Sequence, residues 1–214
     1  MNRIQKLVGL IAVGLFLSTA AIAQDDLYSS ASIGNEGQNG GFFTSATQFL
    51  ASRFTVPDGE TWLVADVGGH IQSWGDDGND LIFAAVIEVE EGGTPPGPRF
   101  DGTVIRGSLT FTPTGELSAH NHNAMNLTLE AGGYALVYGS GEFGATGTGV
   151  MATGNQTGSV DTGPGAGSYM FMSANGNWNN GGFNRVHFGL TEVPEPATLT
   201  LLGLGVLMLV RRRR

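Results

Sequence analysis

The stretch LIFAAVIEVE, residues 81–90, gives the clearest indication of the fold class. Apolar residues occupy every second position of it, and Glu88 and Glu90 fall on the alternate positions near its end. Side chains of a β-strand alternate between the two faces of a sheet, so this period of two predicts a strand with one buried face. The residues on that face are Leu81, Phe83, Ala85, Ile87 and Val89.

The same alternation recurs on both sides of this stretch. Met125, Leu127 and Leu129 alternate with polar residues, and no run in the middle of the chain combines helical periodicity with helix-forming residues. Further candidate strands are residues 48–56, 61–67, 103–111, 134–138, 169–172 and 185–190. Turns rich in Gly, Pro and Asp are expected at residues 57–59, 91–98, 112–115 and 131–133. The pattern predicts an all-β fold, an antiparallel β-sandwich or jelly roll, as one domain over residues 27–190.

The charged residues are distributed unevenly. The chain has 214 residues, with 19 Asp and Glu against 10 Lys and Arg. Six of the basic residues lie near the two ends, so four arginines and all 19 acidic residues share the span from Asp25 to Glu195, a net charge of −15. Such a surface repels phosphate backbones, which excludes nucleic-acid binding. The chain has no Cys, so the domain must depend on its core and its sheet hydrogen bonds rather than on disulfides.

Residues 1–23 have the features of a secretory signal peptide. Arg3 and Lys6 precede the apolar run LVGLIAVGLFL, and a small-residue A-x-A site at Ala21 and Ala23 follows. A basic start, an apolar run and such a site are the three parts of a cleavable export signal. The alternative, an amphipathic first helix, would need a polar face that this run lacks. We therefore expect the protein to be exported.

The other end, residues 193–214, reads VPEPATLTLLGLGVLMLVRRRR. Its apolar part, residues 197–210, would be about 21 Å long as a helix, whereas a bilayer core is about 30 Å thick. We therefore expect a short transmembrane helix that the inner membrane holds transiently. Positive charge beside an apolar span stays on the cytoplasmic side, which places the acidic middle of the chain outside the inner membrane. The basic cluster consists of Arg211, Arg212, Arg213 and Arg214.

Pro194, Glu195 and Pro196, followed at once by the apolar span and the arginine cluster, closely resemble the PEP-CTERM sorting signal of Gram-negative bacteria. The resemblance implies that an exosortase, a membrane transpeptidase, recognises these three residues and removes or exchanges the tail. It also implies delivery to the cell surface or into the exopolysaccharide of an extracellular biofilm matrix. Two prolines keep such a segment extended, as a processing enzyme requires. The alternative is a tail anchor that is never cut.

A second resemblance concerns the middle of the chain. The sequences FTVPDGETW, residues 54–62, and LTLEAGGYALVY, residues 127–138, are similar to those of choice-of-anchor β-sandwich domains, which often precede bacterial sorting signals. This resemblance implies a β-sandwich and carries no functional residues.

The chain offers no recognisable catalytic set, and we expect it not to be an enzyme. Thiol catalysis is impossible without Cys, and no G-x-S-x-G motif marks a nucleophilic serine. Glu88 and Glu90 could serve as a glycosidase pair, but two such carboxylates near a strand end are typical of a solvated face. His120 and His122 could bind a transition metal from one face of an extended segment. No third ligand is evident from the sequence, and a polar loop is the favoured interpretation.

A candidate calcium site lies just before the strand that begins at Leu81. Asp76, Asp77 and Asp80 place hard oxygen ligands on one loop, and calcium takes six to eight such ligands. The alternative is a plain Asx turn without metal. No other cofactor is expected.

Trp178 is the candidate glycan-binding residue. It lies between Asn177 and Asn179 in a Gly-rich stretch, and an exposed indole beside amides suits a sugar. The alternative is that Trp178 packs beneath a loop. Together the patterns predict an exported, surface-sorted protein with a structural or adhesive role. A glycan-binding module assisted by calcium is the alternative, and an extracellular hydrolase that uses Glu88 or His120 is the third hypothesis.

Overall fold

The computed structural model describes residues 26–29, 41–74, 80–90, 93–113, 120–152, 169–180 and 188–192. Within these ranges the chain forms strands, turns and bends, and no residue is helical. Every pair of described strands is antiparallel, which confirms the predicted all-β antiparallel fold. The predicted signal peptide and the predicted C-terminal helix lie outside the described residues.

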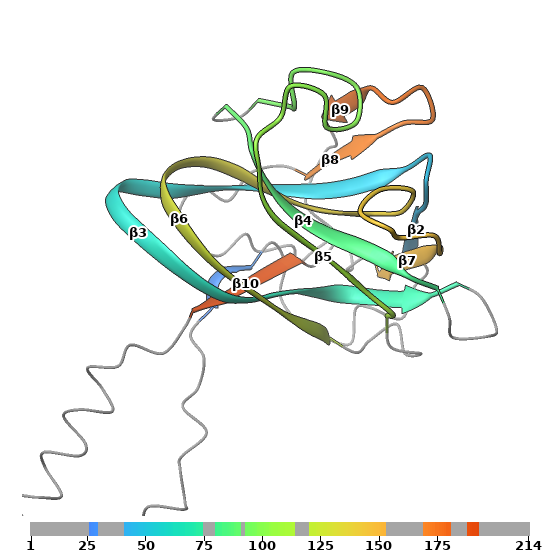
Figure 1. Cartoon of the computed structure of the whole chain (residues 1–214), viewed down its shortest axis with the longest axis horizontal. Coiled ribbons are helices and arrows are strands. Elements are labelled where there is room, and N and C mark those ends of the chain that lie inside the picture. The colour runs from blue at the N-terminus through green and yellow to red at the C-terminus, as the bar shows by residue number, and fades with distance from the viewer. Residues whose placement is uncertain are drawn as a thin grey trace, which may run out of the picture. The chain divides into compact units, whose positions relative to one another are not determined.

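The described strands join into one sheet (Figure 1). They are β1 (Asp26–Ser29), β2 (Gly41–Thr44), β3 (Phe49–Ser73), β4 (Ile82–Glu88), β5 (Ile105–Phe111), β6 (His120–Gly139), β7 (Gly149–Ala152), β8 (Tyr169–Met172), β9 (Trp178–Asn180) and β10 (Phe188–Glu192). The hydrogen-bonded order is β1-β10-β3-β6-β4-β5. Near the end of β3, β7 pairs with residues 71–73 and carries β2. Near its start, β8 pairs with residues 49–52 and carries β9. The described fold is therefore built around β3.

β3 and β6 run side by side and bend together. Their pairing extends from residues 50 and 138 at one end to residues 70 and 120 at the other, with register shifts between residues 56 and 61 and between residues 64 and 66. Figure 1 shows both strands curving round at their middle, so that the two halves of each strand face one another across the interior. Two long strands therefore supply both walls of the core.

The predicted turns at residues 57–59 and 131–133 are wrong. Both segments are parts of continuous strands, the first of β3 and the second of β6. Pro57 and Gly59 produce the corner at which β3 bends, because Pro57 cannot donate to a ladder and Gly59 adopts a φ of 82° that favours glycine. The residues of a tight turn thus serve here to bend a sheet, as residues at a β-bulge do.

The first hydrophobic cluster fills the interior between the two halves. Phe54 stacks on Trp62 and on Tyr134, with ring centroids 5.9 and 5.6 Å apart, and it lies against Tyr28 at 5.3 Å. These rings come from β1, both halves of β3, and β6, so the cluster ties the halves together. Met125, Leu127 and Leu129 face this cluster, as predicted.

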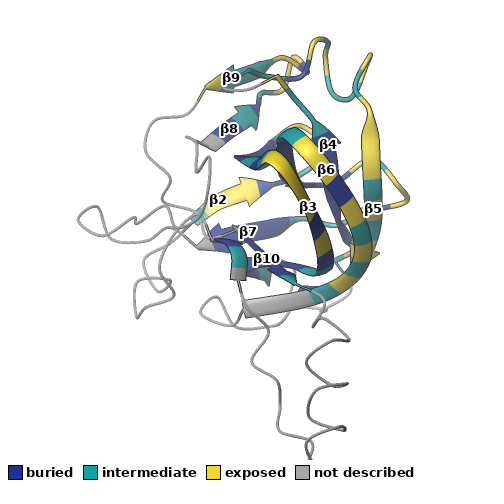
Figure 2. Cartoon of the chain, turned by 90° about the vertical axis from the view of Figure 1, so that its left-hand side faces the viewer, coloured by how far each residue is buried: buried dark blue, intermediate teal, exposed yellow. Residues whose placement is uncertain are grey.

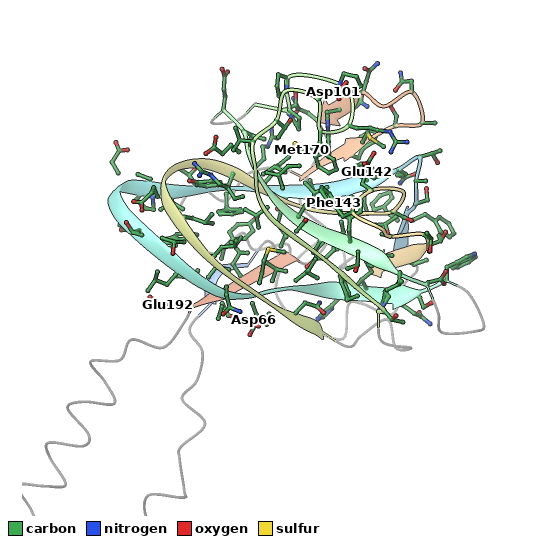
Figure 3. The ribbon with its side chains drawn as sticks, in the orientation of Figure 1. Asp66, Asp101, Glu142, Phe143, Met170 and Glu192 are labelled. Atoms are coloured by element: carbon green, nitrogen blue, oxygen red, sulfur yellow. The ribbon has the colours of Figure 1, made fainter. Side chains whose placement is uncertain are left out.

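β4 buries both of its faces rather than one. Ile82, Ala84 and Val86 belong to the first cluster, and Phe83, Ala85 and Ile87 belong to a second cluster on the other side of the sheet. Phe100 and Phe143, from the segments after β4 and β6, contact the Phe83 ring at 5.8 and 5.1 Å. Figure 2 shows β4 buried along its length, and Figure 3 shows Phe143 and Met170 on the covered side. The prediction of one buried face was incomplete, because these segments cover the second face of β4. Leu81, which was predicted to lie on the buried face, is exposed.

Candidate functional site

The most exposed large hydrophobic side chain among the described residues is Trp74, at 61%. It follows the last residue of β3 directly. Phe43 of β2, 40% exposed, packs edge to face against it, with ring centroids 4.5 Å apart and an interplanar angle of 81°. These two residues, the Phe43–Trp74 pair, form an aromatic surface in contact with solvent.

The strands beneath the pair determine which side chains accompany it. β7 lies between β2 and β3, and the register sets Phe43 opposite Val150 and Val150 opposite Gln72. Opposite residues of an antiparallel ladder share one face of the sheet. Val150, opposite Phe43, is only 7% exposed. The face therefore presents two aromatic rings with the amide side chain of Gln72 beside them.

Hydrogen bonds hold Trp74 and the described residues nearest to it. The Trp74 backbone N–H donates to the Thr148 carbonyl at 3.0 Å. Asp80 joins the neighbouring segments, because its Oδ2 accepts from the Ser73 hydroxyl at 2.7 Å and its Oδ1 accepts from the Thr148 N–H at 3.1 Å. Gly147 permits this close approach, since an added Cβ would lie 2.5 Å from the Asp80 Cα. The backbone of Trp74 is therefore hydrogen-bonded to the segment that precedes β7.

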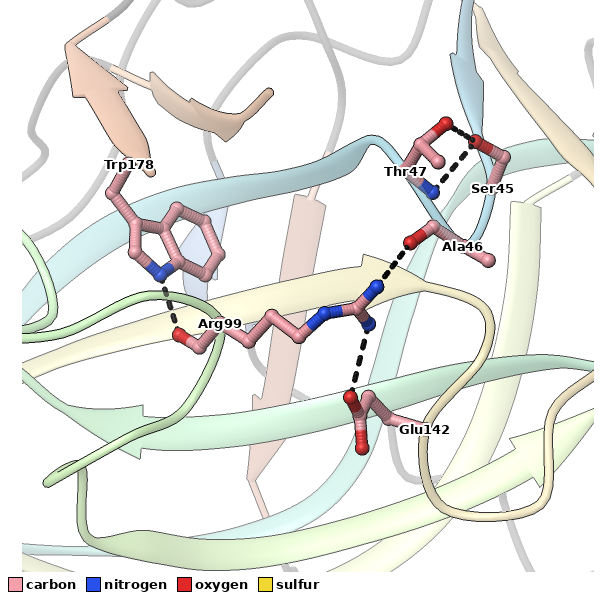
Figure 4. Close-up of polar contacts among 6 residues, drawn as sticks. All are labelled: Ser45, Ala46, Thr47, Arg99, Glu142 and Trp178. Carbon is pink, nitrogen blue, oxygen red and sulfur yellow. Dashed lines mark hydrogen bonds and ion pairs between the residues drawn. The ribbon is translucent and has the colours of Figure 1, made fainter. Parts of the chain in front are cut away.

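Trp178, the predicted glycan-binding residue, is partly buried. Its Nε1–H donates to the Arg99 carbonyl at 2.6 Å, and its ring packs near Phe49 and Phe100. The Arg99 guanidinium in turn donates to the Ala46 carbonyl at 2.9 Å and forms an ion pair with Glu142 at 3.0 Å (Figure 4). Trp178 thus fastens the segment that covers the second cluster. Its ring has less free surface for a sugar than that of Trp74, which the sequence interpretation did not select.

Asn177 belongs to the turn that precedes Trp178, and Asn179 belongs to β9, the short strand that contains Trp178. The Asn177 N–H donates to the Asn175 side chain at 3.1 Å, and the Asn179 amide donates to the Ser173 hydroxyl at 3.1 Å. These contacts give the two asparagines a local structural role. Glycan binding by Trp178, Asn177 and Asn179 stays a prediction.

The calcium prediction falls partly outside the described residues. Asp76 and Asp77 lie there, and the described member, Asp80, accepts the two hydrogen bonds that hold the Trp74 segment. Among the side chains that the structure describes, no three His, Cys, Asp or Glu gather as metal ligands. Calcium binding stays a prediction.

Glu88, the last residue of β4, and Glu90, in the segment after β4, have different surroundings. Glu88 forms an ion pair with Arg106 of β5, whereas Glu90 is exposed. The ion pair gives Glu88 a structural partner across the strands.

Backbone register, rather than sequence proximity, brings histidines together. His120 is paired with His70 across the β3–β6 ladder, and His122 is paired with Gly68. Only the backbone of His120 and His122 is described. His70 is 3% exposed, and burial lowers the pKa of its imidazole from the usual 6.5, so that it is neutral at pH 7. The sequence interpretation did not select His70, because nothing local indicates which strand lies beside residue 120.

The described residues contain no helix long and apolar enough to cross a membrane. A family model, the PEP-CTERM protein-sorting motif, matches residues 192–214. The chain carries a PEP-CTERM sorting motif. The motif implies an exported protein that an exosortase recognises and targets to the cell surface, as the C-terminal residues predicted. Searches of curated proteins and of solved structures found no match to this chain.

Proposed function

We propose that this PEP-CTERM protein is a structural or adhesive component of the cell surface or extracellular matrix, and that the Phe43–Trp74 pair contacts a polysaccharide there. The observation that carries the proposal is the pair itself, two exposed rings in contact with each other in a chain that carries a surface-sorting motif. The motif accounts for the delivery of the protein, and the pair gives it a surface suited to contact after delivery.

Sugars suit this surface for a physical reason. The apolar C–H face of a pyranose stacks on an aromatic ring, while its hydroxyls exchange hydrogen bonds with a neighbouring amide such as that of Gln72. Covering about 100 Å² of indole contributes about 2.5 kcal/mol. The ordering of a sugar chain offsets part of this gain. A weak single contact, repeated along a polymer by many copies of the protein, is typical of adhesion.

The charge of the chain narrows the class of polysaccharide. The span that contains the sheet carries a net charge of −15, and like charges repel a polyuronate. A neutral glycan avoids this repulsion. We therefore propose a neutral polysaccharide as the partner, rather than an anionic one.

Co-sedimentation of the full-length protein, solubilised in detergent, with an insoluble neutral β-glucan tests the proposal. Trp74→Ala is expected to weaken binding by about tenfold or more, as the loss of one stacked ring predicts. Ile105→Ala is the matched control, since Ile105 is as exposed as Phe43 but lies on β5. Equal binding by wild type and Trp74→Ala, or an equal loss in Ile105→Ala, would overturn the role of the pair.

A further inference from the structure

We propose that the Phe43–Trp74 pair binds a free glycan chain, one that can turn at the contact, and not the flat face of a crystalline polysaccharide. The inference rests on the proposed function, and it adds the physical form of the polysaccharide that the pair accepts. It is carried by the angle between the two ring planes, which is 81°.

The angle decides how many of the two rings a flat surface can contact. Stacking gains its energy from close contact between the apolar C–H face of a pyranose and the face of an aromatic ring, so the two planes must lie nearly parallel. Two coplanar rings could lie together on a flat sheet of sugar chains. Rings inclined at 81° cannot do so. A crystal face therefore stacks on only one ring of the pair.

A free chain can use both rings. The edge of one ring meets the face of the other, with centroids 4.5 Å apart, so the remaining ring surfaces form a corner. Rotation about glycosidic bonds lets neighbouring sugars of a free chain turn relative to one another. One sugar can then stack on one ring while the next contacts the other. Both rings have surface left for this contact, since Phe43 is 40% and Trp74 is 61% exposed.

The corner depends on strand pairing as well as on the ring contact. Phe43 belongs to β2 and Trp74 follows β3, and β7 is paired with both of these strands. The Trp74 N–H also donates to the carbonyl of Thr148, the residue before β7. The edge-to-face arrangement is itself favourable, because the positive edge of one ring meets the negative face of the other. The angle is therefore a property of the folded sheet.

Two preparations of one neutral β-1,4-glucan test the inference, crystalline cellulose and acid-swollen amorphous cellulose. They share sugar and linkage and differ in the order of their chains. Co-sedimentation of the full-length protein in detergent gives the dissociation constant for each. We expect the protein to bind amorphous cellulose at least about tenfold more tightly, because a second ring contributes to the contact.

Phe43→Ala tests the contribution of the second ring. It is expected to weaken binding to amorphous cellulose by about tenfold. Binding to crystalline cellulose should stay unchanged, since the more exposed Trp74 is the ring that a flat face contacts. Val104→Ala is the control, because Val104 is 50% exposed and precedes β5, and it should change neither affinity.

The outcomes separate this inference from the proposed function. Binding to crystalline cellulose that equals or exceeds binding to the amorphous form would overturn the inference and leave the polysaccharide contact standing. So would a Phe43→Ala variant that binds amorphous cellulose like the wild type, or an equal loss in Val104→Ala. Binding to neither preparation would overturn the proposed function, and this inference with it.

Discussion

Trp178→Ala is expected to destabilise the fold, whereas Trp74→Ala is expected to leave its stability nearly unchanged. Trp178 packs near Phe49 and Phe100 and donates a hydrogen bond to the Arg99 carbonyl. Burying roughly 100–150 Å² of indole at about 25 cal/mol per Å² contributes about 3 kcal/mol, and the hydrogen bond adds about 1 kcal/mol. Relaxation of the covering segment recovers part of this sum, so we expect a loss of about 3 kcal/mol.

Urea unfolding of the detergent-solubilised protein, followed by far-ultraviolet circular dichroism, measures the difference. Tryptophan fluorescence is unsuitable because the variants differ in tryptophan content. Trp178→Phe is the matched control, since it keeps a ring but loses the N–H donor, and it should cost less than Trp178→Ala. Trp74→Ala should change the free energy of unfolding by no more than about 0.5 kcal/mol, as surface substitutions do.

Two results would refute the reasoning. If Trp178→Ala changed the free energy of unfolding by less than about 0.5 kcal/mol, the indole would not pack against the second cluster as described. If Trp74→Ala cost as much as Trp178→Ala, the exposed aromatic surface would instead be a structural contact, and the proposed polysaccharide site would lose its basis.

Three further predictions address packing, calcium and sorting. Gly139→Ala should lower the stability by about 1–3 kcal/mol, because its Cβ would lie 2.4 Å from a Phe49 ring carbon and 2.7 Å from one of Phe83; an unchanged melting temperature would contradict this close packing. If Asp76, Asp77 and Asp80 bind calcium, added Ca²⁺ should raise the melting temperature, and Asp80→Asn should abolish this increase. A melting temperature that does not change with Ca²⁺ would argue against the site. Exosortase processing predicts that mass spectrometry of the protein from the outer surface finds no peptide with Arg211 to Arg214, whereas an intact tail there would refute processing.

Local patterns in the sequence suffice to predict the strands that are long and half buried. The alternation around Met125, Leu127 and Leu129 predicts their inward face correctly. It does not predict the second buried face of β4, since that face depends on Phe100 and Phe143, which lie in covering segments without periodicity. β1, β2, β7 and β9 have only three or four residues each, too few for a period of two to stand out.

The corner residues were misassigned for a related reason. Pro57 and Gly59 have the same local chemistry in a hairpin turn and in the bend of a long strand. The two cases differ in which strand lies alongside, and that pairing involves residues about 70 positions away. A sequence pattern specifies the bend but not its partner.

The candidate site residues show the same limit. The amides and glycines around Trp178 indicate exposure, but its actual surroundings come from Arg99, 79 residues away. Trp74 has no distinctive neighbours in the sequence, and it becomes a surface feature through Phe43 and the strand pairing of β7. His120 and His122 were noticed from their spacing, whereas His70 joins them only through the register. The sorting motif was predictable because its parts are consecutive in the chain.

The place of β10 matters because the sorting motif begins where this strand ends. β10 ends at Glu192, where the sorting motif begins, and it is paired with β1 on one side and with β3 on the other. A mechanical load that enters through the tail therefore reaches a strand with neighbours on both edges. To pull this strand free, a force must rupture two ladders of hydrogen bonds rather than one.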